Sequence, residues 1–451
     1  MHPKVKLPDI NPSEGFPEVV IRGKLFLMLI FLIKKQLSFF STQICKAYLC
    51  SMSSQTAYVI DAVRTPIGKY AGSLANTRPD DLLAMVIKAL VQRNPNIDIN
   101  EIEDVIAGAA NQSGEDNRDV ARMSALLAGL PISVGGNTVN RLCASGLQAI
   151  MDASRSIMCN EGSLYIAGGV ESMSRAPFVM PKADGAFSRN PQIYDTTMGW
   201  RFVNPKLSAL YHPYTMGETA ENVANQWNIS REEQDEFAMN SQRKYQLAYL
   251  AHKFIDEIIP VTLDLGKGKT STFDTDEHPR LSTIEKLAEL KAAFTKDGTV
   301  TAGNSSGIND GASALLLASD EAVKKFDLAP MGKIKAMAIA GVDPSVMGIG
   351  PVPAVRKALQ RAGISARDVG LVELNEAFAS QSLACIAELG FHPDIINVNG
   401  GAIALGHPLG ASGARISTTL LHEMKKRDVQ YGVATMCIGV GQGAAIVYEK
   451  L

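Results

Sequence analysis

The chain has 451 residues, 46% of them apolar and 20% charged, so it can bury one large core or several ordinary ones. Its 44 Lys and Arg nearly balance its 46 Asp and Glu, and no basic block is long enough to indicate a nucleic-acid partner. The six cysteines are scattered, form no C-x-x-C pair and are too sparse for a disulfide framework. The composition therefore favours a globular protein of a reducing compartment.

The first fifty residues differ in character from the rest. An apolar run over Leu25–Ile33, flanked by lysines, is too short to span a bilayer, which needs about 20 residues. A signal peptide is an alternative, but no small-residue cleavage site follows the run. We expect Met52 to be the natural start, residues 1–51 to be a non-native or disordered extension, and the protein to be cytoplasmic without a membrane segment.

From residue 55 onward, strand and helix patterns alternate along the chain. The expected strands are 56–61, 104–109 and 163–169, and the expected helices are 80–91, 120–128 and 143–159. This alternation predicts an α/β fold in which helices cover both faces of a sheet.

Between about residues 172 and 299 the alternation gives way to a Pro-rich, aromatic and charged stretch. It contains one well-marked helix, which Ser230 opens with Glu233 three residues later as a capping box. We expect this stretch to be an insertion or a lid on the core.

A second α/β segment begins near Gly332 and echoes the first. Residues 364–373 parallel residues 99–105 and the strand after them. Residues 137–149 and 397–414 are both Asn-opened strand-to-helix turns that carry a reactive residue beside an A-S-G triplet. A duplicated half-domain explains these echoes, and two related halves would meet at one active site.

A cysteine in the motif N-R-L-C-A-S-G-L, residues 140–147, is the first candidate for chemistry. Cys143 stands where a strand-rich segment meets a helix. The positive end of the helix dipole and free backbone N–H groups would lower the pKa of its thiol toward thiolate, as a nucleophile requires. A buried, unreactive cysteine is the alternative.

A histidine lies in a glycine-rich loop, N-G-G-A-I-A-L-G-H-P-L-G-A-S-G, residues 399–413. A backbone so poor in side chains can come close to a ligand, and His407 could take a proton from a thiol. His407 is therefore the candidate base for Cys143, with a purely structural histidine as the alternative.

Two shorter motifs add further polar groups. The motif C-I-G-V-G-Q-G, residues 437–443, joins the thiol of Cys437 to backbone N–H groups around Gly439 that could bind an oxyanion. In N-E-A-F-A, residues 375–379, Asn375 could hold a water or a carbonyl oxygen and Glu376 could orient its neighbours. The alternatives are an ordinary tight turn for the first motif and helix N-capping for the second.

Together the four motifs resemble the thiolase family, and the similarity covers nearly all of the chain after residue 55. The resemblance implies a five-layered αβαβα architecture built from two related half-domains. It implies an N-terminal domain over 52–320, with an inserted loop domain at about 172–299, and a C-terminal domain over 328–451.

The same resemblance implies a role for each motif residue. Cys143 would become acylated, His407 would activate it, and Cys437 would move the proton to or from the α-carbon of acetyl-CoA. One oxyanion hole would consist of His407 and a water held by Asn375, and the other of the backbone N–H groups of Cys143 and Gly439. The family uses no cofactor and no metal, and we find no cluster with zinc-ligand spacing.

Segments of the insertion and of the following strand match the part of the family that binds coenzyme A. By resemblance, Met216 would pack near the acyl or pantetheine chain, Arg280 would lie near the nucleotide, and Ser306 would contact the pantetheine. Thr215 stands where many biosynthetic acetoacetyl-CoA thiolases have histidine, which argues against that substrate. The implied substrates are coenzyme A and a 3-oxoacyl-CoA, and the implied assembly is a homodimer or homotetramer.

Three features narrow the resemblance to the 3-oxoadipyl-CoA thiolases of aromatic-compound degradation, which form succinyl-CoA and acetyl-CoA. They are residues 114–123, residues 184–205, and Val440 in place of a third consecutive glycine. A dicarboxylic acyl chain would need a cation or polar cradle for its distal carboxylate, and Arg201 is a candidate.

Three other functions remain as alternatives. An acetyl-CoA acetyltransferase or a fatty-acid 3-oxoacyl-CoA thiolase would share every catalytic residue. A decarboxylating ketoacyl synthase would pair Cys143 with two histidines instead of His407 and Cys437. An inactive thiolase-like acyl or lipid carrier would lack a reactive residue, whereas all four motif residues are present here.

Overall fold

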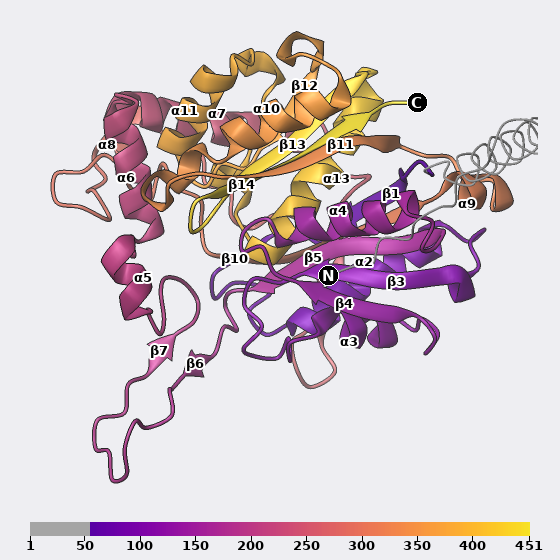
Figure 1. Ribbon diagram of the computed structural model, residues 1–451, viewed down its shortest axis with the longest axis horizontal. Coiled ribbons are helices and arrows are strands. Elements are labelled where there is room, and N and C mark those ends of the chain that lie inside the picture. Colours follow the sequence, from indigo (N-terminus) through magenta and orange to yellow (C-terminus); the bar gives the residue numbers. More distant parts are fainter. Residues whose placement is uncertain (1–54) are drawn as a thin grey trace, which may run out of the picture. The chain divides into compact units, whose positions relative to one another are not determined.

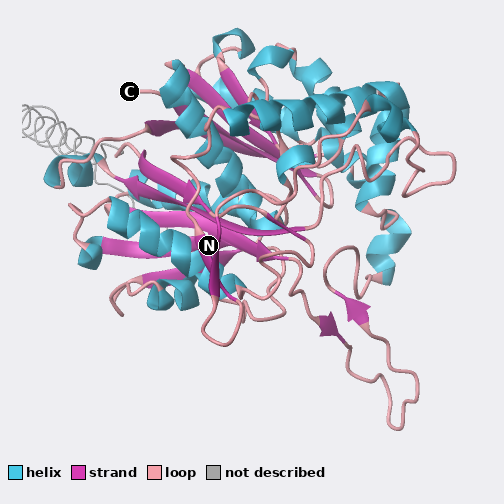
Figure 2. Ribbon diagram, turned by 180° about the vertical axis from the view of Figure 1, so that it is seen from behind, coloured by secondary structure: helices cyan, strands magenta, loops and turns pink. Residues whose placement is uncertain are grey.

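The computed structural model describes residues 55–451, and the expectations for the N-terminal extension and for Met52 lie outside this part. A ten-stranded mixed sheet with the order β12-β13-β14-β11-β1-β10-β5-β3-β4, in which β2 pairs with β10, runs through it (Figures 1 and 2). Among the helices of residues 55–451, none combines the length and the apolar character needed to cross a bilayer.

The strands of this sheet are β1 (Tyr58–Arg64), β2 (Gly68–Lys69), β3 (Ile102–Gly108), β4 (Gly135–Val139), β5 (Leu164–Ser172), β10 (Asn309–Ala318), β11 (Gly332–Gly341), β12 (Leu371–Leu374), β13 (Tyr431–Ile438) and β14 (Gln442–Glu449). Two small hairpins are β6 (Phe178–Val179) with β7 (Tyr194–Asp195), and β8 (Val261–Asp264) with β9 (Thr270–Phe273). The α-helices are α2 (Pro79–Arg93), α3 (Val120–Leu127), α4 (Ser145–Met158), α5 (Pro205–Leu210), α6 (Met216–Gln226), α7 (Arg231–Leu250), α8 (Ile284–Ala288), α9 (Asp320–Lys325), α10 (Pro351–Ala362), α11 (Ala379–Leu389), α12 (Ala402–Leu405) and α13 (Leu409–Arg427).

The sheet consists of two halves with the same internal pairing. In the first, β1 and β5 run antiparallel to β10, and β3 runs parallel to β5. In the second, β11 and β13 run antiparallel to β14, and β12 runs parallel to β13. The halves join where β1 runs beside β11, at Tyr58 opposite Lys333 and Val59 opposite Gly332. The repeated pairing confirms the predicted relationship between the two halves.

Helices form three further layers around the two half-sheets (Figure 1). Helices α2 and α3 cover the outer face of the first half, and α10 and α11 cover that of the second. Helices α4 and α13 pack against each other and against strands of both halves. The central core lies around these two helices, with Leu147 and Ile150 of α4 next to Leu420 and Leu421 of α13. The predicted αβαβα layering is therefore confirmed.

Helices α4 and α13 meet backbone to backbone at their first turns. A Cβ atom on Gly146 would lie 2.7 Å from the Gly410 carbonyl oxygen, and one on Gly413 would lie 2.2 Å from the Leu147 nitrogen. Only a residue without a side chain fits at such a contact. The N-terminal ends of the two helices therefore lie side by side, and Cys143 and His407 immediately precede them.

The inserted stretch is richer in structure than predicted. In place of one well-marked helix, it contains four, α5 to α8, and the two hairpins. The predicted capping box of Ser230 and Glu233 is present at α7. Thr215 and Glu218 form the same device at α6, and their T-x-x-E spacing was a readable signal for that helix.

Replacing Gly413 with alanine should destabilise the fold, because the new Cβ would overlap the Leu147 backbone. Overpacking of this kind costs about 1–3 kcal/mol. Urea unfolding followed by circular dichroism should therefore show a clearly lower midpoint. The control is Gly185→Ala, where a Cβ meets nothing within 4 Å, and the change should stay within about 0.5 kcal/mol. Equal effects of the two replacements would contradict the close helix contact.

Candidate active site

Cys143 lies in the turn between β4 and α4. The residue before it, Leu142, has φ 48°, a left-handed conformation that is strained for a leucine. Asn140 Oδ1 holds this turn by accepting the Leu142 N–H at 2.8 Å, and Ser145 Oγ accepts the Arg141 N–H at 2.9 Å. The helix begins at Ser145, two residues later than predicted, because the turn occupies the positions before it.

The pKa of Cys143 is set mainly by burial. Loss of hydration raises the pKa of the thiol to about 11, although the N–H groups of Gly439 and of Cys143 itself hydrogen-bond to the sulfur and oppose this shift. The expectation that the helix terminus would lower this pKa is therefore wrong, because desolvation outweighs the local donors. At neutral pH the thiol keeps its proton, so a base must remove it.

His407 is a buried neutral imidazole of defined orientation. Its backbone N–H donates to Asn309 Oδ1 at 2.9 Å, and its Nδ1 lies 2.6 Å from Ser412 Oγ. The single hydroxyl proton of Ser412 goes to the Pro408 carbonyl at 2.8 Å, so Ser412 accepts the Nδ1–H of His407. Burial, with a smaller effect of the Arg415 cation, lowers the pKa of His407 to about 3. Nε2 is thus left with a lone pair that can accept a proton.

Asn375 faces His407 from the end of β12. Its Nδ2 lies 3.4 Å from His407 Nε2, and the residue is fully buried. Its Oδ1 has no hydrogen-bond partner within residues 55–451, so the amide oxygen is free to hold a polar group of a ligand. The N-cap of the next helix, α11, is Phe378. The helix-capping alternative for Asn375 is therefore wrong.

Glu376 anchors the segment that leads to His407. It accepts hydrogen bonds from Ser241 Oγ and Asn397 Nδ2, both at 2.7 Å, and from the Ile403 N–H at 3.2 Å. These donors lie on α7, on the loop between α11 and α12, and on α12. The prediction that Glu376 could orient its neighbours agrees with these contacts.

Cys437 is the second-last residue of the buried strand β13, next to the turn that carries Gly439. Burial, and then the nearby Cys143 thiol, raise its pKa well above the usual value, so this second thiol is also protonated at neutral pH. Val440, the next residue of the turn, has φ 63°, a strained conformation for a β-branched residue. The two N–H groups that face the Cys143 sulfur thus both lie in strained turns.

Two of the three residues predicted to bind substrate lie beside these groups. Met216 packs in an apolar cluster with Cys437 and Phe378, and its sulfur would lie 3.7 Å from a Cβ on Gly439. Ser306 donates its backbone N–H to the Ala377 carbonyl at 3.0 Å, in the N-E-A-F-A motif.

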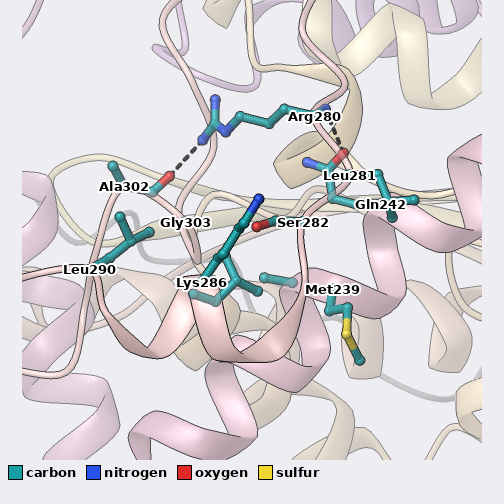
Figure 3. A pocket seen from close by; sticks show the side chains of 11 residues that line it. Met239, Gln242, Arg280, Leu281, Ser282, Lys286, Leu290, Ala302 and Gly303 are labelled. Carbon is teal, nitrogen blue, oxygen red and sulfur yellow. Dashed lines mark hydrogen bonds between the residues drawn. The ribbon is translucent and has the colours of Figure 1, made fainter.

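Arg280 lies apart from the thiols and lines a separate cavity of about 410 Å³ between α7 and α8 (Figure 3). Its backbone N–H donates to Gln242 Oε1 at 2.9 Å, and its guanidinium donates to the Ala302 carbonyl at 2.6 Å. Ala302 and Gly303 line this cavity, and Ser306 follows three residues after Gly303, where it contacts Ala377. Lys286 adds a second cation to the lining, so the cavity suits an anionic group.

Several residues that shape the site were not predicted. They are Ser412, which orients His407, Asn309, which holds its backbone, and Lys286 in the cavity. A hydroxyl in the first turn of the helix after His407 was a weak signal for Ser412. Within residues 55–451, no three metal-ligating side chains gather in a way that could hold a metal ion.

Lowering the pH should destabilise the protein through His407. The pKa of His407 is about 3 in the fold against 6.5 without the fold, so between these values the unfolded chain binds a proton that the native chain does not. The contribution of His407 to the free energy of unfolding is fully present above pH 6.5. It is lost as the pH falls, by up to about 1.4 kcal/mol per pH unit. His407→Gln removes this loss, so its free energy of unfolding should fall less steeply between about pH 6 and pH 4.

Urea unfolding at a series of pH values measures both slopes. The control is His392→Gln, because the side chain of His392 is 72% exposed, and this variant should keep the slope of the unmodified protein. Identical slopes for His407→Gln and the unmodified protein would contradict a buried neutral imidazole.

Known proteins with this sequence pattern are thiolases. The family model described as thiolase, N-terminal domain, matches residues 57–321, and that described as thiolase, C-terminal domain, matches residues 328–450. A beta-ketoadipyl-CoA thiolase of Acinetobacter baylyi is 55% identical over 88% of this chain and 99% of that protein. A 3-oxoadipyl-CoA/3-oxo-5,6-dehydrosuberyl-CoA thiolase of Escherichia coli is 53% identical over the same shares.

Solved structures agree with this relationship. The acetyl-CoA acetyltransferase of Bacillus anthracis has a TM-score of 0.83 at 42% identity, over 88% of this chain and 99% of that one. The human mitochondrial 3-ketoacyl-CoA thiolase in complex with CoA has a TM-score of 0.82 at 40% identity, over 88% of this chain and 98% of that one. The chain therefore belongs to the thiolase family, whose members are acyltransferases.

Proposed function

We propose that this protein is a 3-oxoadipyl-CoA thiolase, which converts 3-oxoadipyl-CoA and CoA into succinyl-CoA and acetyl-CoA. One observation carries the mechanism: two protonated thiols and a neutral imidazole with an accepting Nε2 are gathered at the adjoining ends of α4, α13 and β13. Relatives that are 53–56% identical and bear the name of this reaction support the substrate.

In the first half-reaction, Cys143 attacks the C3 carbonyl of the substrate while its proton passes to His407 Nε2. The bond between C2 and C3 breaks, and its electron pair moves onto the acetyl-CoA fragment as an enolate. Cys437 donates its thiol proton to the α-carbon of this enolate, and acetyl-CoA leaves. The high pKa that burial imposes on Cys437 keeps this proton in place until the carbanion forms.

In the second half-reaction, the thiol of a new CoA attacks the acyl group on Cys143. Cys437, left as a thiolate by the first half-reaction, takes the proton of CoA. The sulfur of Cys143 leaves as thiolate and regains its proton from His407 Nε2, and succinyl-CoA is released. A thioester on Cys143 is as energetic as the CoA thioester that it replaces, so transfer is reversible.

Two oxyanion sites support these steps. The N–H groups of Cys143 and Gly439 already converge on the Cys143 sulfur, where they would also receive the oxyanion of an attacked acyl carbonyl. His407, once protonated on Nε2, and the Asn375 amide with a water would stabilise the enolate oxygen of acetyl-CoA. The two sites match the two positions at which negative charge develops.

The distal carboxylate of the acyl chain needs a cation, and Arg201 is the candidate. It is half-buried and forms no ion pair with another residue of 55–451. Its neighbour Trp200 donates its indole N–H to the Tyr214 carbonyl at 2.9 Å, two residues before Met216. Arg201 is therefore held near the start of the helix that carries the proposed acyl-chain contact.

A cytoplasmic location and association into a homodimer or homotetramer are part of the same proposal. Residues 178–195, from β6 to β7, form an arm on which large apolar side chains are exposed. They include Phe178 at 73%, Phe187 at 98% and Ile193 at 67% exposure. Exposed apolar side chains gathered on one segment favour association. Light scattering on the purified protein would detect a monomer, which would contradict this part.

The purified protein should cleave 3-oxoadipyl-CoA with CoA at a higher kcat/KM than acetoacetyl-CoA or a medium-chain 3-oxoacyl-CoA. Loss of the 3-oxoacyl-CoA and chromatography of the products measure this preference. Cys143→Ser should lower kcat by more than about a thousandfold, because a serine hydroxyl is a far weaker nucleophile in this setting.

The control for that variant is Cys159→Ser, which alters an exposed thiol and should keep full activity. Full thiolysis by Cys143→Ser would refute the proposed mechanism. A preference for acetoacetyl-CoA or the longer chain would refute the substrate and leave the mechanism. Inactivity on all three substrates would favour the acyl carrier.

Arg201→Gln should lower kcat/KM for 3-oxoadipyl-CoA by about 10- to 100-fold, the effect of losing a charge-assisted hydrogen bond. The same variant should leave acetoacetyl-CoA thiolysis unchanged, since that substrate has no distal carboxylate. Arg189→Gln, an exposed arginine on the arm of residues 178–195, is the control and should change neither activity. Equal losses on both substrates would exclude a carboxylate contact.

A further inference from the structure

Glu171, near the end of β5, is a buried carboxylate that none of the mechanistic steps uses. It is 3% exposed. Its Oε2 accepts the Gly410 N–H at 2.7 Å and the Ala110 N–H at 2.9 Å, and its Oε1 accepts the Asn111 N–H at 3.0 Å. Gly410 is the second residue of α13, and the other two donors follow β3. One carboxylate therefore joins two segments that are distant in sequence.

The contacts of Glu171 continue to the nucleophile. The carbonyl of Ala110 accepts Asn140 Nδ2 at 2.9 Å, and Asn140 Oδ1 accepts the Leu142 N–H at 2.8 Å. Leu142 is the strained residue directly before Cys143. A continuous series of contacts thus runs from Gly410, three residues after His407, to the turn of the nucleophile.

The surrounding backbone is too tightly packed to absorb a change in this series. A Cβ on Gly410 would lie 2.3 Å from the Val170 carbonyl oxygen, and one on Gly169 would lie 2.0 Å from the Gly410 carbonyl oxygen. The start of α13 therefore rests directly on β5, next to Glu171. A shift of either segment must move the other.

Burying the negative charge of Glu171 costs free energy, and this charge does not assist the reaction at Cys143. Within residues 55–451 no cationic side chain pairs with Glu171, and burial, aided by Asp116, raises the pKa of its carboxyl to about 7 despite the three N–H donors. Its negative charge also raises the pKa of the Cys143 thiol and so opposes the thiolate. What a carboxylate provides here is two acceptor oxygens for three converging N–H groups.

We propose that Glu171 is a positioning residue of the thiolase reaction, which fixes His407 relative to Cys143 by joining the start of α13 to the Asn140 turn. This inference rests on the proposed function. Misplacing reacting groups by about 1 Å can slow a reaction by about a hundredfold. Glu171 therefore contributes to the rate of acyl transfer and not to substrate affinity.

The test is the transfer of an acyl group from succinyl-CoA or acetyl-CoA to Cys143, followed by rapid quenching and intact-mass measurement. In Glu171→Gln an NH₂ group replaces one carboxylate oxygen, and it cannot accept a hydrogen bond from the backbone N–H groups that face it. We expect its acylation rate and kcat to fall by about 10- to 100-fold, with KM changed by less than about threefold. A KM increase with unchanged kcat would overturn the proposal.

Asn140→Ala tests the other end of the series and is safer for folding, because Asn140 is exposed. It should show the same kcat loss with little change in KM. The double variant should be no slower than the slower single variant, because both changes break one series of contacts. If the two losses multiply instead, Glu171 and Asn140 act independently and the proposal is wrong.

The matched control is Asp320→Asn, which also removes a carboxylate acceptor from a backbone N–H, that of Thr56 at 2.7 Å. Asp320 begins α9, away from both catalytic turns, so this variant should keep the normal acylation rate. Normal acylation by Glu171→Gln as well would refute the positioning role alone. Failure of the unmodified protein to become acylated would refute the proposed function, and the positioning role with it.

Discussion

The contact between the first turns of α4 and α13 is the constraint on which the rest of the structure depends. At Gly146 and Gly413 the two backbones touch without intervening side chains. Helix α4 follows β4 of the first half-sheet and α13 leads into β13 of the second, so this single contact sets how the two halves approach each other. It also brings together the two turns that carry Cys143 and His407. A larger residue at either glycine would separate nucleophile and base as well as loosen the core.

Burial has the same chemical effect on all three proton-transfer groups. It raises the pKa of Cys143 and Cys437 and lowers that of His407, so each is neutral before reaction. A site of neutral donors and acceptors avoids the large cost of enclosing an unpaired charge. Charge arises only when the proton moves from Cys143 to His407, and the converging N–H groups are then already in place. Exclusion of water would also protect the acyl-enzyme from hydrolysis.

Buried ion pairs connect the insertion to this centre. Arg64, at the end of β1, pairs with Glu257 at 2.6 Å and with Asp276 at 2.7 Å, and both carboxylates belong to the insertion. Arg415 of α13 pairs with Glu373 of β12 at 3.1 Å, and its charge helps to lower the pKa of His407. Breaking a buried pair is strongly destabilising because it leaves an uncompensated charge. The two pairs of Arg64 therefore hold the insertion, which carries Met216 and Arg280, in a fixed place on the core, and the pair of Arg415 joins α13 to β12.

The sequence by itself determined the family, the layered α/β fold and the residues that carry the chemistry. Their signals are local: Cys143 and His407 each precede a helix with small residues, and Ser230 opens a capping box. The tertiary structure decided the direction of the pKa shift of Cys143, because desolvation depends on every layer packed around the thiol. It also decided the orientation of His407 by Ser412 and the role of Glu171, whose bond to Gly410 spans 239 residues. No local pattern records a contact of that separation, since it exists only once both half-sheets have closed around α4 and α13.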